Sequence, residues 1–225
     1  MGVRIRLSDP IRRISRDPDS GITLYTADGR ERFDSCLVTI SPRLFSKMMP
    51  QLPDEYLRGL SQLKSMGAVV MVLALKHQLS QEGYYWFNLP KPAGFPYLAL
   101  VEHTNYVSPE NFGGDHILYV GDYLEAGHEY FALSKQELLD RFLPTFKRFN
   151  QHFEPDWIRD SWLFRTDYAQ PVPLLNHSGN IPAIKTPVDG LFFASMSQVY
   201  PWDRGTNFAV EIGRRAAGIM FGERG

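Results

Sequence analysis

Gly190-Leu-Phe-Phe-Ala-Ser195 begins the segment that decides the fold of this chain. A loop through Tyr200-Pro-Trp-Asp-Arg204 follows, and the segment ends with Gly205-Thr-Asn-Phe-Ala-Val-Glu-Ile-Gly-Arg-Arg-Ala-Ala-Gly-Ile-Met220. The apolar run at 191–194 predicts a short strand buried on both faces, and apolar residues recur at helical spacing after Gly205. The helix would begin near the end of the strand. Its free N–H groups and its dipole would stabilise an anionic or electron-rich ligand edge there.

The composition describes a folded and nearly neutral chain. Its 225 residues are 44% apolar and 13% aromatic, which is enough for one large domain or two small ones. Lys and Arg number 24 against 25 Asp and Glu, so the net charge of −1 gives no electrostatic case for nucleic acid as a partner. No apolar run approaches the ~20 residues of a transmembrane helix, and the first residues do not resemble a signal peptide.

The residues that could carry chemistry without a cofactor are few. The histidines form no His-x-x-x-His pair and have no cysteine partners, so no metal site is predicted. Gly-x-Ser-x-Gly and the phosphate-binding loop motif are both absent. Cys36 is the only cysteine, which excludes an internal disulfide and fits a cytoplasmic location. It could be a redox thiol or a site of covalent cofactor attachment, but its strand context favours a small buried residue.

The closing segment resembles that of the flavin-containing amine oxidase and protoporphyrinogen oxidase superfamily of FAD-dependent oxidoreductases. The resemblance rests on the Gly-Leu-aromatic strand, the Pro-containing loop and the helix pattern Gly-x-x-x-Ala-Val-x-x-Gly-Arg-x-Ala-Ala. Tyr-Pro-x-Asp-Arg-Gly-Thr-Asn at 200–207 is similar to a bacterial branch whose members are mostly called FAD-dependent oxidoreductases. In the family the helix N-terminus faces the flavin ring, so the resemblance implies FAD as cofactor.

The resemblance also implies which residues touch the cofactor. A strand near Ile11 would offer its backbone to the adenine. Ser195 and Met196 stand where the family usually has Gly-Asp or a similar acidic pair that hydrogen-bonds the ribityl or phosphate region. The resemblance therefore implies a weaker cofactor affinity through side chains at this point. The loop and helix start would face the flavin, and they contribute Arg204, Gly205, Thr206 and Asn207. For Arg204 a salt bridge with Asp203 or Glu211 that orders the loop is the alternative.

Alternating apolar and charged residues predict a small antiparallel meander at the start of the chain, with strands at 3–7, 11–16 and 22–25 and a further buried strand at 33–40. A helix over 52–66 and strands at 68–76, 84–88, 97–103 and 116–123 follow. Ser134-Lys-Gln-Glu137 is a capping box that opens a helix. Its apolar stripe, which Pro144 should kink, reads as core packing rather than a cofactor box. Residues 157–172 are expected to form a return strand, which in the family borders the flavin.

We therefore expect an α/β fold of mixed α+β character in two lobes. Residues 1–45 and 180–225 would form part of an FAD-binding domain, and 46–179 a substrate domain with a mixed or antiparallel sheet and helices. This chain order follows from the resemblance. Substrate contacts are predicted for Glu102, His103 and Asn105, in a polar cluster at the end of an apolar strand, and also for Trp86 of the aromatic-rich stretch and for Gln170. In the alternative, the polar cluster 102–105 only satisfies nearby backbone groups. No catalytic residue is singled out.

Three departures from the family pattern bear on activity. Amine-oxidising members carry a lysine four residues beyond a glycine, and counting from Gly67 this chain has Met71 at that position. Their aromatic cage residue, just before the final helix, falls near Gly205. This favours dehydrogenation of an apolar or carbonyl-rich substrate over amine oxidation. The Gly-x-Gly-x-x-Gly unit that opens family members is absent, so the resemblance covers only their C-terminal half.

Two functions stay open. In the first, the chain is an FAD-dependent oxidoreductase that takes a hydride from a small organic substrate held in an aromatic-rich lobe (Tyr84, Tyr85, Trp86, Phe87 and Tyr97). In the second, it is a non-catalytic fragment or binding subunit that needs an N-terminal FAD-binding half on a separate chain. Activity as an enzyme would then depend on completion by that part.

Overall fold

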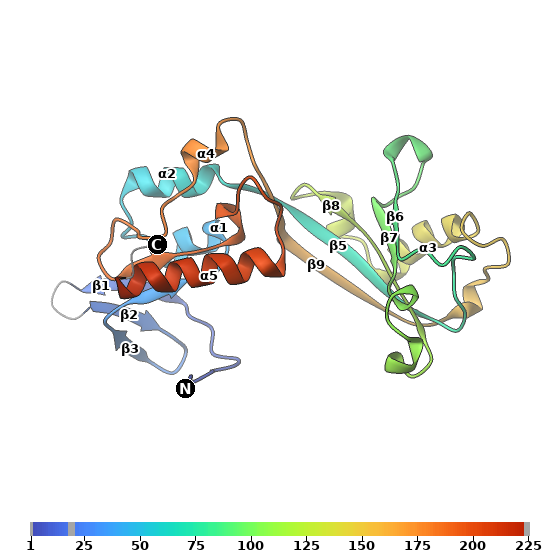
Figure 1. Cartoon of the computed structure of the whole chain (residues 1–225), viewed down its shortest axis with the longest axis horizontal. Coiled ribbons are helices and arrows are strands. Elements are labelled where there is room, and N and C mark those ends of the chain that lie inside the picture. Colours follow the sequence, from blue (N-terminus) through green and yellow to red (C-terminus); the bar gives the residue numbers. More distant parts are fainter. Residues whose placement is uncertain (1, 18–20, 223–225) are drawn as a thin grey trace. The chain divides into compact units, whose positions relative to one another are not determined.

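The fold is described by a computed structural model that covers residues 2–17 and 21–222. It is a mixture of helices and sheets, which confirms the expected fold class (Figure 1). The chain divides into two compact units. Unit 1 contains the chain up to Lys64 and from Pro171 onward, and unit 2 is Ser65–Gln170. These limits differ from the expected 45/46 and 179/180.

Unit 1 begins with a three-stranded antiparallel sheet, β1 (Arg13–Asp17), β2 (Gly21–Tyr25) and β3 (Arg30–Phe33). The predicted meander is therefore present, but the strand expected at 3–7 is wrong. That segment pairs with no described strand, and its three apolar side chains are 79%, 78% and 84% exposed. The third strand is β3, because the Asp28-Gly29 turn returns the chain alongside β2.

Two helices, α1 (Pro42–Met48) and α2 (Asp54–Gln62), contribute to the same hydrophobic core as the inner face of this sheet. The sequence did not predict α1, because Ser41-Pro42 was read only as the end of a strand. The same two residues start a helix, since the Ser41 hydroxyl accepts the N–H of Leu44 at 3.3 Å and Pro42 occupies the first turn. α2 ends four residues before the expected limit, and Leu60 anchors it in the core of unit 1.

The rest of unit 1 contains a parallel pair of short strands, β4 (Cys36–Val38) and β10 (Leu191–Phe193). The short helix α4 (His177–Asn180) precedes β10, and α5 (Thr206–Phe221) follows it. Ile212 and Ala216 of α5 pack against Phe192 and Ala194. The strand, loop and helix predicted for the closing segment are thus confirmed.

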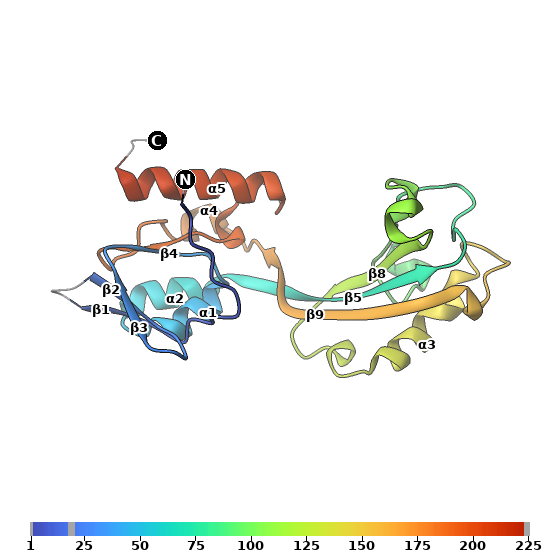
Figure 2. The same cartoon turned by 90° about the horizontal axis from the view of Figure 1, so that it is seen from below.

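Unit 2 contains one five-stranded sheet in the order β6-β7-β8-β5-β9. Its strands are β5 (Lys64–Leu75), β6 (Trp86–Asn88), β7 (Ala99–Glu102), β8 (His116–Leu124) and β9 (Ile158–Val172). One face packs against α3 (Lys135–Phe146), as Figure 2 shows. The predicted aromatic stripe of α3 is in the core, where Leu138, Phe142 and Phe146 are at most 1% exposed. Pro144 lies in the last turn, so the helix continues to Phe146.

Short 3₁₀ turns connect these elements: η1 (Lys91–Ala93), η2 (His103–Asn105), η3 (Pro109–Phe112), η4 (Glu129–Phe131), η5 (Pro155–Trp157) and η6 (Met196–Gln198). Within residues 2–17 and 21–222, no helix is both long enough and apolar enough to cross a bilayer.

Candidate functional site

The segment from β10 to α5 places its polar groups at the carboxyl end of the parallel pair. β4 and β10 run in the same direction, and the N–H of Ala194 donates to the carbonyl of Val38 at 3.0 Å. The chain then turns through η6 and a loop into α5. Ligands of α/β proteins bind outside the carboxyl ends of parallel strands, where loops and helix N-termini gather. This end of unit 1 therefore has the geometry of a cofactor-binding surface. We call the turn at 195–198 and the start of α5 at 204–207 the cofactor wall.

Ser195 contributes an unpartnered hydroxyl to that wall. Its side chain is 7% exposed, and its N–H donates to Oε1 of Gln198 at 2.7 Å. The two residues are arranged as a capping box, but the N–H of Gln198 donates to the Ser195 carbonyl at 3.0 Å. The buried Oγ of Ser195 is left without a hydrogen-bond partner in the described part of the chain. An unsatisfied buried hydroxyl is costly, so it fits a site that receives a polar ligand atom.

Gln198 is the residue of this wall that sequence reasoning missed. Besides accepting from Ser195, it donates through Nε2 to the carbonyls of Pro182 and Phe193 at 3.0 and 3.1 Å. It thereby fixes the turn after β10, while Met196 beside it is half-buried. The spacing Ser-x-x-Gln is a capping-box pattern, and it could have identified this turn from the sequence.

The start of α5 is open to solvent. Gly205 is the N-cap residue and has no side chain with which to cap the helix, and Arg204, Thr206 and Asn207 are exposed. A Cβ on Gly205 would lie 2.7 Å from Oδ1 of Asn207, so the position requires glycine while Asn207 keeps this rotamer. Asp203 accepts the backbone N–H of Arg204 at 2.7 Å, which orders the loop.

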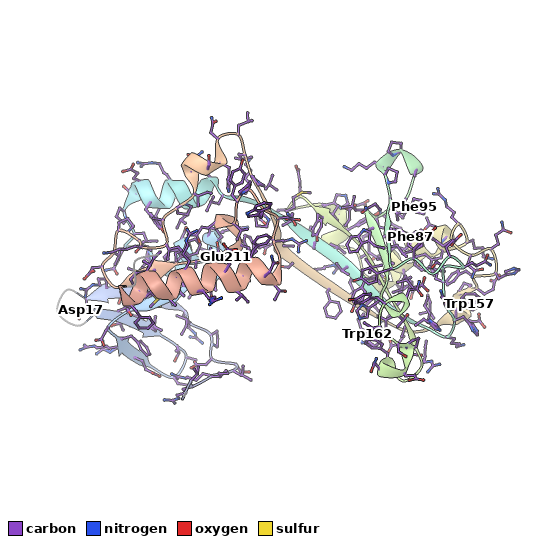
Figure 3. The ribbon with its side chains drawn as sticks, in the orientation of Figure 1. Asp17, Phe87, Phe95, Trp157, Trp162 and Glu211 are labelled. Carbon is purple, nitrogen blue, oxygen red and sulfur yellow. The ribbon has the colours of Figure 1, made fainter. Side chains whose placement is uncertain are left out.

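Ile11 lies in unit 1 as well, half-buried against the core formed by β1, β2 and α1. Trp202 of the loop stacks on Phe208 of α5, with centroids 6.2 Å apart and ring planes 8° apart. A cavity of about 60 Å³ lies beside this pair and also touches Gln198 and Glu211. Figure 3 labels Glu211 on α5. All the predicted cofactor residues thus belong to one unit.

Glu102 and Asn105, predicted as substrate contacts in unit 2, form a buried clamp instead. Glu102 is 0% exposed, and its two carboxylate oxygens accept the N–H groups of Leu79 at 2.5 Å and Ser80 at 2.9 Å. Asn105 donates to the same carboxylate at 3.0 Å and to the carbonyl of Tyr84 at 3.0 Å. This arrangement is the one that the backbone-satisfying alternative predicts.

The other predicted substrate residues are separate from this clamp. His103 is half-buried, with ring centroids 5.6 Å from Phe112 and 5.7 Å from Tyr119. Trp86 is 51% exposed and donates to Asn88 at 2.7 Å. Gln170 is half-buried near the end of β9. Of the aromatic stretch, Tyr84 and Tyr85 are exposed like Trp86, whereas Tyr97 is in the core.

The sheet face opposite α3 is hollowed and apolar, and we call it the open face. Its hollow is about 530 Å³, a size suited to a small organic molecule, and it is lined by Val70, Val72, Tyr119, Trp162 and Phe164. The strand register puts Trp86, Val101, Tyr119 and Val72 in one row across four strands. Figure 3 labels Trp162. The pair Trp162 and Phe164, two residues apart on β9, was the available sequence signal for this face.

Met71 does not belong to the open face. It is 0% exposed, lies opposite Val120 and packs in the core under α3. Because side chains alternate along a strand, Val70 and Val72 are the neighbours that reach the open face. The position that corresponds to the lysine of amine-oxidising members, four residues beyond Gly67, is therefore a core position. The adjacent residues that reach the open face, Val70 and Val72, are not lysines either.

Cys36 is a packing residue of β4. Burial raises the pKa of its thiol to about 11, so the thiol stays protonated at neutral pH and is a weak nucleophile. In the parts of the chain that the structure describes, no group of three His, Cys, Asp or Glu side chains is placed to hold a metal ion.

The chain belongs to the family of flavin containing amine oxidoreductases, whose model matches residues 1–220. Its fold is similar to that of putrescine oxidase bound to putrescine (17% identity, 94% of this chain and 48% of that one, TM-score 0.70). It is also similar to cyclohexylamine oxidase from Brevibacterium oxydans IH-35A (17%, 94% and 47%, 0.69). A provisionally named protoporphyrinogen oxidase from Exiguobacterium sp. 255-15 matches with 16% identity, 96% and 47% coverage and a TM-score of 0.70.

The chain spans about half the length of these three structures. A search of curated proteins found no match. Membership of the family makes a flavin the implied cofactor, and the low identities show a shared fold rather than a shared substrate.

Proposed function

We propose that this chain forms the C-terminal part of an FAD-dependent oxidoreductase that acts on a small organic substrate. The observation that carries the proposal is the wall of unit 1, where an unpartnered buried hydroxyl lies in the turn that follows two parallel strands. A bound flavin would supply hydride acceptance, which side chains alone cannot provide. A cytoplasmic location, favoured by the lone cysteine, is part of the same proposal.

The cofactor would be held by groups of unit 1. The Ser195 hydroxyl is suited to a ribityl or phosphate oxygen, since it can both donate and accept. The free N–H groups at the start of α5, on Thr206 and Asn207, would stabilise negative charge on the flavin ring. Arg204 would bind a carbonyl or phosphate oxygen, Met196 would line the wall and the backbone at Ile11 would meet the adenine.

The substrate would bind on the open face of unit 2, bordered by Trp86 and His103, with Gln170 further along β9. Its lining residues carry no charge. Burial of an ammonium without a carboxylate costs several kcal/mol. A cation–π contact with an aromatic ring would stabilise the buried ammonium by only about 0.5–2 kcal/mol. The balance favours an apolar or carbonyl-rich substrate that is neutral when bound.

Flavin spectroscopy tests this proposal. The purified protein, dialysed against FAD, should keep the visible absorbance bands of bound flavin. Gly205→Val should weaken retention, because its Cβ displaces Asn207 at the start of α5. Gly213→Ala is the matched control, since a Cβ there meets nothing within 4 Å. A colourless protein that FAD does not restore would contradict the proposal for this chain.

A second function is favoured by the half-length coverage and by the missing Gly-x-Gly-x-x-Gly unit. In it, the chain alone binds FAD weakly and serves as a binding subunit for a separate N-terminal FAD-binding half. Its parallel sheet of only two strands supports this, because parallel sheets are normally larger and covered on both faces. Adding a polypeptide with the glycine-rich unit should then restore flavin binding. Full retention of FAD by this chain alone would contradict the second function.

A further inference from the structure

The outer face of the β1-β2-β3 sheet carries an unusual cluster of arginines. The register places Arg13, Tyr25 and Arg30 in one row across the three strands. The next row along the strands is Ser15, Thr23 and Arg32. The opposite face packs into the core through Ile14, Ile22 and Leu24. We call Arg13, Arg30, Arg32 and Tyr25 the arginine face; β1, β2 and β3 are labelled in Figures 1 and 2.

Tyr25 is the centre of the arginine face. The Arg13 guanidinium lies 5.5 Å from the centroid of the Tyr25 ring. The Ser15 hydroxyl donates to the Tyr25 hydroxyl at 3.4 Å, so the ring extends from its own row over the next one. The hydrogen bond from Ser15, followed by the charges of Arg13 and Arg30, lowers the pKa of Tyr25. Two arginine charges thus act on this hydroxyl.

No described carboxylate forms an ion pair with Arg13, Arg30 or Arg32. Glu31 points to the other side of β3 and contacts Arg6. Asp17 stands one row beyond Ser15 and has contacts of its own, and Asp28 belongs to the adjoining turn. Figure 3 labels Asp17. Arg13 and Arg30 flank Tyr25, and Arg32 is in the next row of the same face. Like charges placed this close repel each other, and an added anion would relieve the repulsion.

We propose that the arginine face is a binding site for a phosphoryl anion, held by Arg13, Arg30 and Arg32 with the Tyr25 hydroxyl as a further donor. Neighbouring strands are about 4.8 Å apart, so the Cα atoms of Arg13 and Arg30 stand about 10 Å apart on either side of Tyr25. Two extended guanidinium groups can converge over that span. Their planar forks match the geometry of phosphoryl oxygens, which accept two hydrogen bonds from each fork.

None of the residues of the arginine face is among the proposed cofactor contacts, although one of those contacts, Ile11, lies two residues before β1. The face lies on strands β1 to β3, whereas the wall is formed after β10 and at the start of α5. Loss of the arginine face would therefore leave the flavin spectrum unchanged. Failure of flavin binding would in turn leave the anion site standing.

Isothermal titration of the full chain with inorganic pyrophosphate at near-physiological salt tests the proposal. We expect saturable binding that Arg30→Gln weakens by about tenfold or more, because each charge-assisted contact contributes on that scale. Arg58→Gln is the matched control, since it removes the same charge from an exposed position of unit 1 on α2. Absence of saturable binding, or an equal loss in both variants, overturns the site.

A second readout uses Tyr25. Bound anion should raise the pKa of one tyrosine in a near-ultraviolet absorbance titration, and Tyr25→Phe should abolish that shift. A shift that persists in Tyr25→Phe overturns the proposal. Parallel titrations with ADP and with pyrophosphate identify the source of the phosphoryl group. Tighter binding of ADP that Arg30→Gln weakens points to a nucleotide, and equal binding of the two points to a free anion. Binding of ADP that Arg30→Gln leaves unchanged overturns its assignment to this face.

Discussion

At the scale of single residues, Glu102 shows how one buried carboxylate can organise a loop. Both of its oxygens accept backbone N–H groups from Leu79 and Ser80, and Asn105 donates to it from η2. The carboxylate has no access to solvent, so all of its hydrogen bonds come from the protein. A group buried in this way is costly to alter, because its partners are left unsatisfied when it changes.

Glu102→Gln should lower the free energy of unfolding by about 2–3 kcal/mol, because an amide replaces one charged acceptor oxygen by a donor that faces an N–H group. Urea denaturation followed by circular dichroism measures this. Glu129→Gln is the control, since its exposed ion pair with Arg141 contributes less than about 1 kcal/mol. If the two variants lose the same stability, Glu102 is not a clamp.

The sequence could place Glu102-His103-Thr104-Asn105 at a strand end but could not decide its role. A polar cluster at that position reads equally as a binding wall or as a cap for neighbouring backbone. The decision depends on Leu79 and Ser80, more than 20 residues away in the chain, and only the fold brings them together. Gln198 differs, because its partner Ser195 is three residues away and the local pattern already contained the contact.

At the scale of elements, helix starts follow local rules closely. The capping box of α3 is formed as expected: Ser134 accepts the N–H of Glu137 at 3.2 Å, and Glu137 accepts the N–H of Ser134 at 2.7 Å. Pro144 did not end α3, because it lies in the last turn, where the loss of one backbone hydrogen bond matters little. The expected ends of α2 and of the 33–40 strand are wrong, because strand pairing sets both of them. α2 ends before β5 begins at Lys64, and β4 ends at the residue that pairs with the last residue of β10.

Ser134→Ala should cost about 1 kcal/mol, because the N–H of Glu137 loses its acceptor. The loss should appear as a lower urea midpoint with an unchanged slope. Ser46→Ala in α1 is the matched control. Its hydroxyl only donates to the Pro42 carbonyl one turn back, so its removal should change stability by less than about 0.5 kcal/mol. Equal losses in the two variants would show that the cap of α3 contributes nothing.

At the scale of the whole molecule, the sequence predicts a discontinuous two-part chain with limits at 45/46 and 179/180, whereas the compact units of the structure have limits at 64/65 and 170/171. The strand expected at 3–7 shows a limit of prediction from periodicity. Val3, Ile5 and Leu7 alternate as in a half-buried strand, yet no described strand pairs with them. An alternating pattern indicates a segment with one apolar face that is suited to burial. It does not show whether another segment of the same chain covers that face.

These three side chains should promote self-association. Replacing Val3, Ile5 and Leu7 together by threonine should reduce concentration-dependent light scattering, because it removes a contiguous apolar strip. The free energy of unfolding should change by less than about 0.5 kcal/mol, since the strip is exposed. Leu175→Thr, which removes a single apolar side chain that is 93% exposed, is the comparison. Scattering that is unaffected by the triple variant would contradict this reading.

β5 and β9 are neighbours in the sheet of unit 2, and Gly67 of β5 lies close to Thr166 and Asp167 of β9, near the two limits of that unit. The chain thus enters and leaves unit 2 through two adjacent strands. Insertions or deletions between β5 and β9 leave the spacing of these two strands unaltered at the point where they connect to the rest of the chain. Unit 1 therefore need not adjust to such changes. The geometry is that of an exchangeable cassette: evolution or a protein engineer can remodel the open face and its loops while the remainder of the chain keeps its own fold.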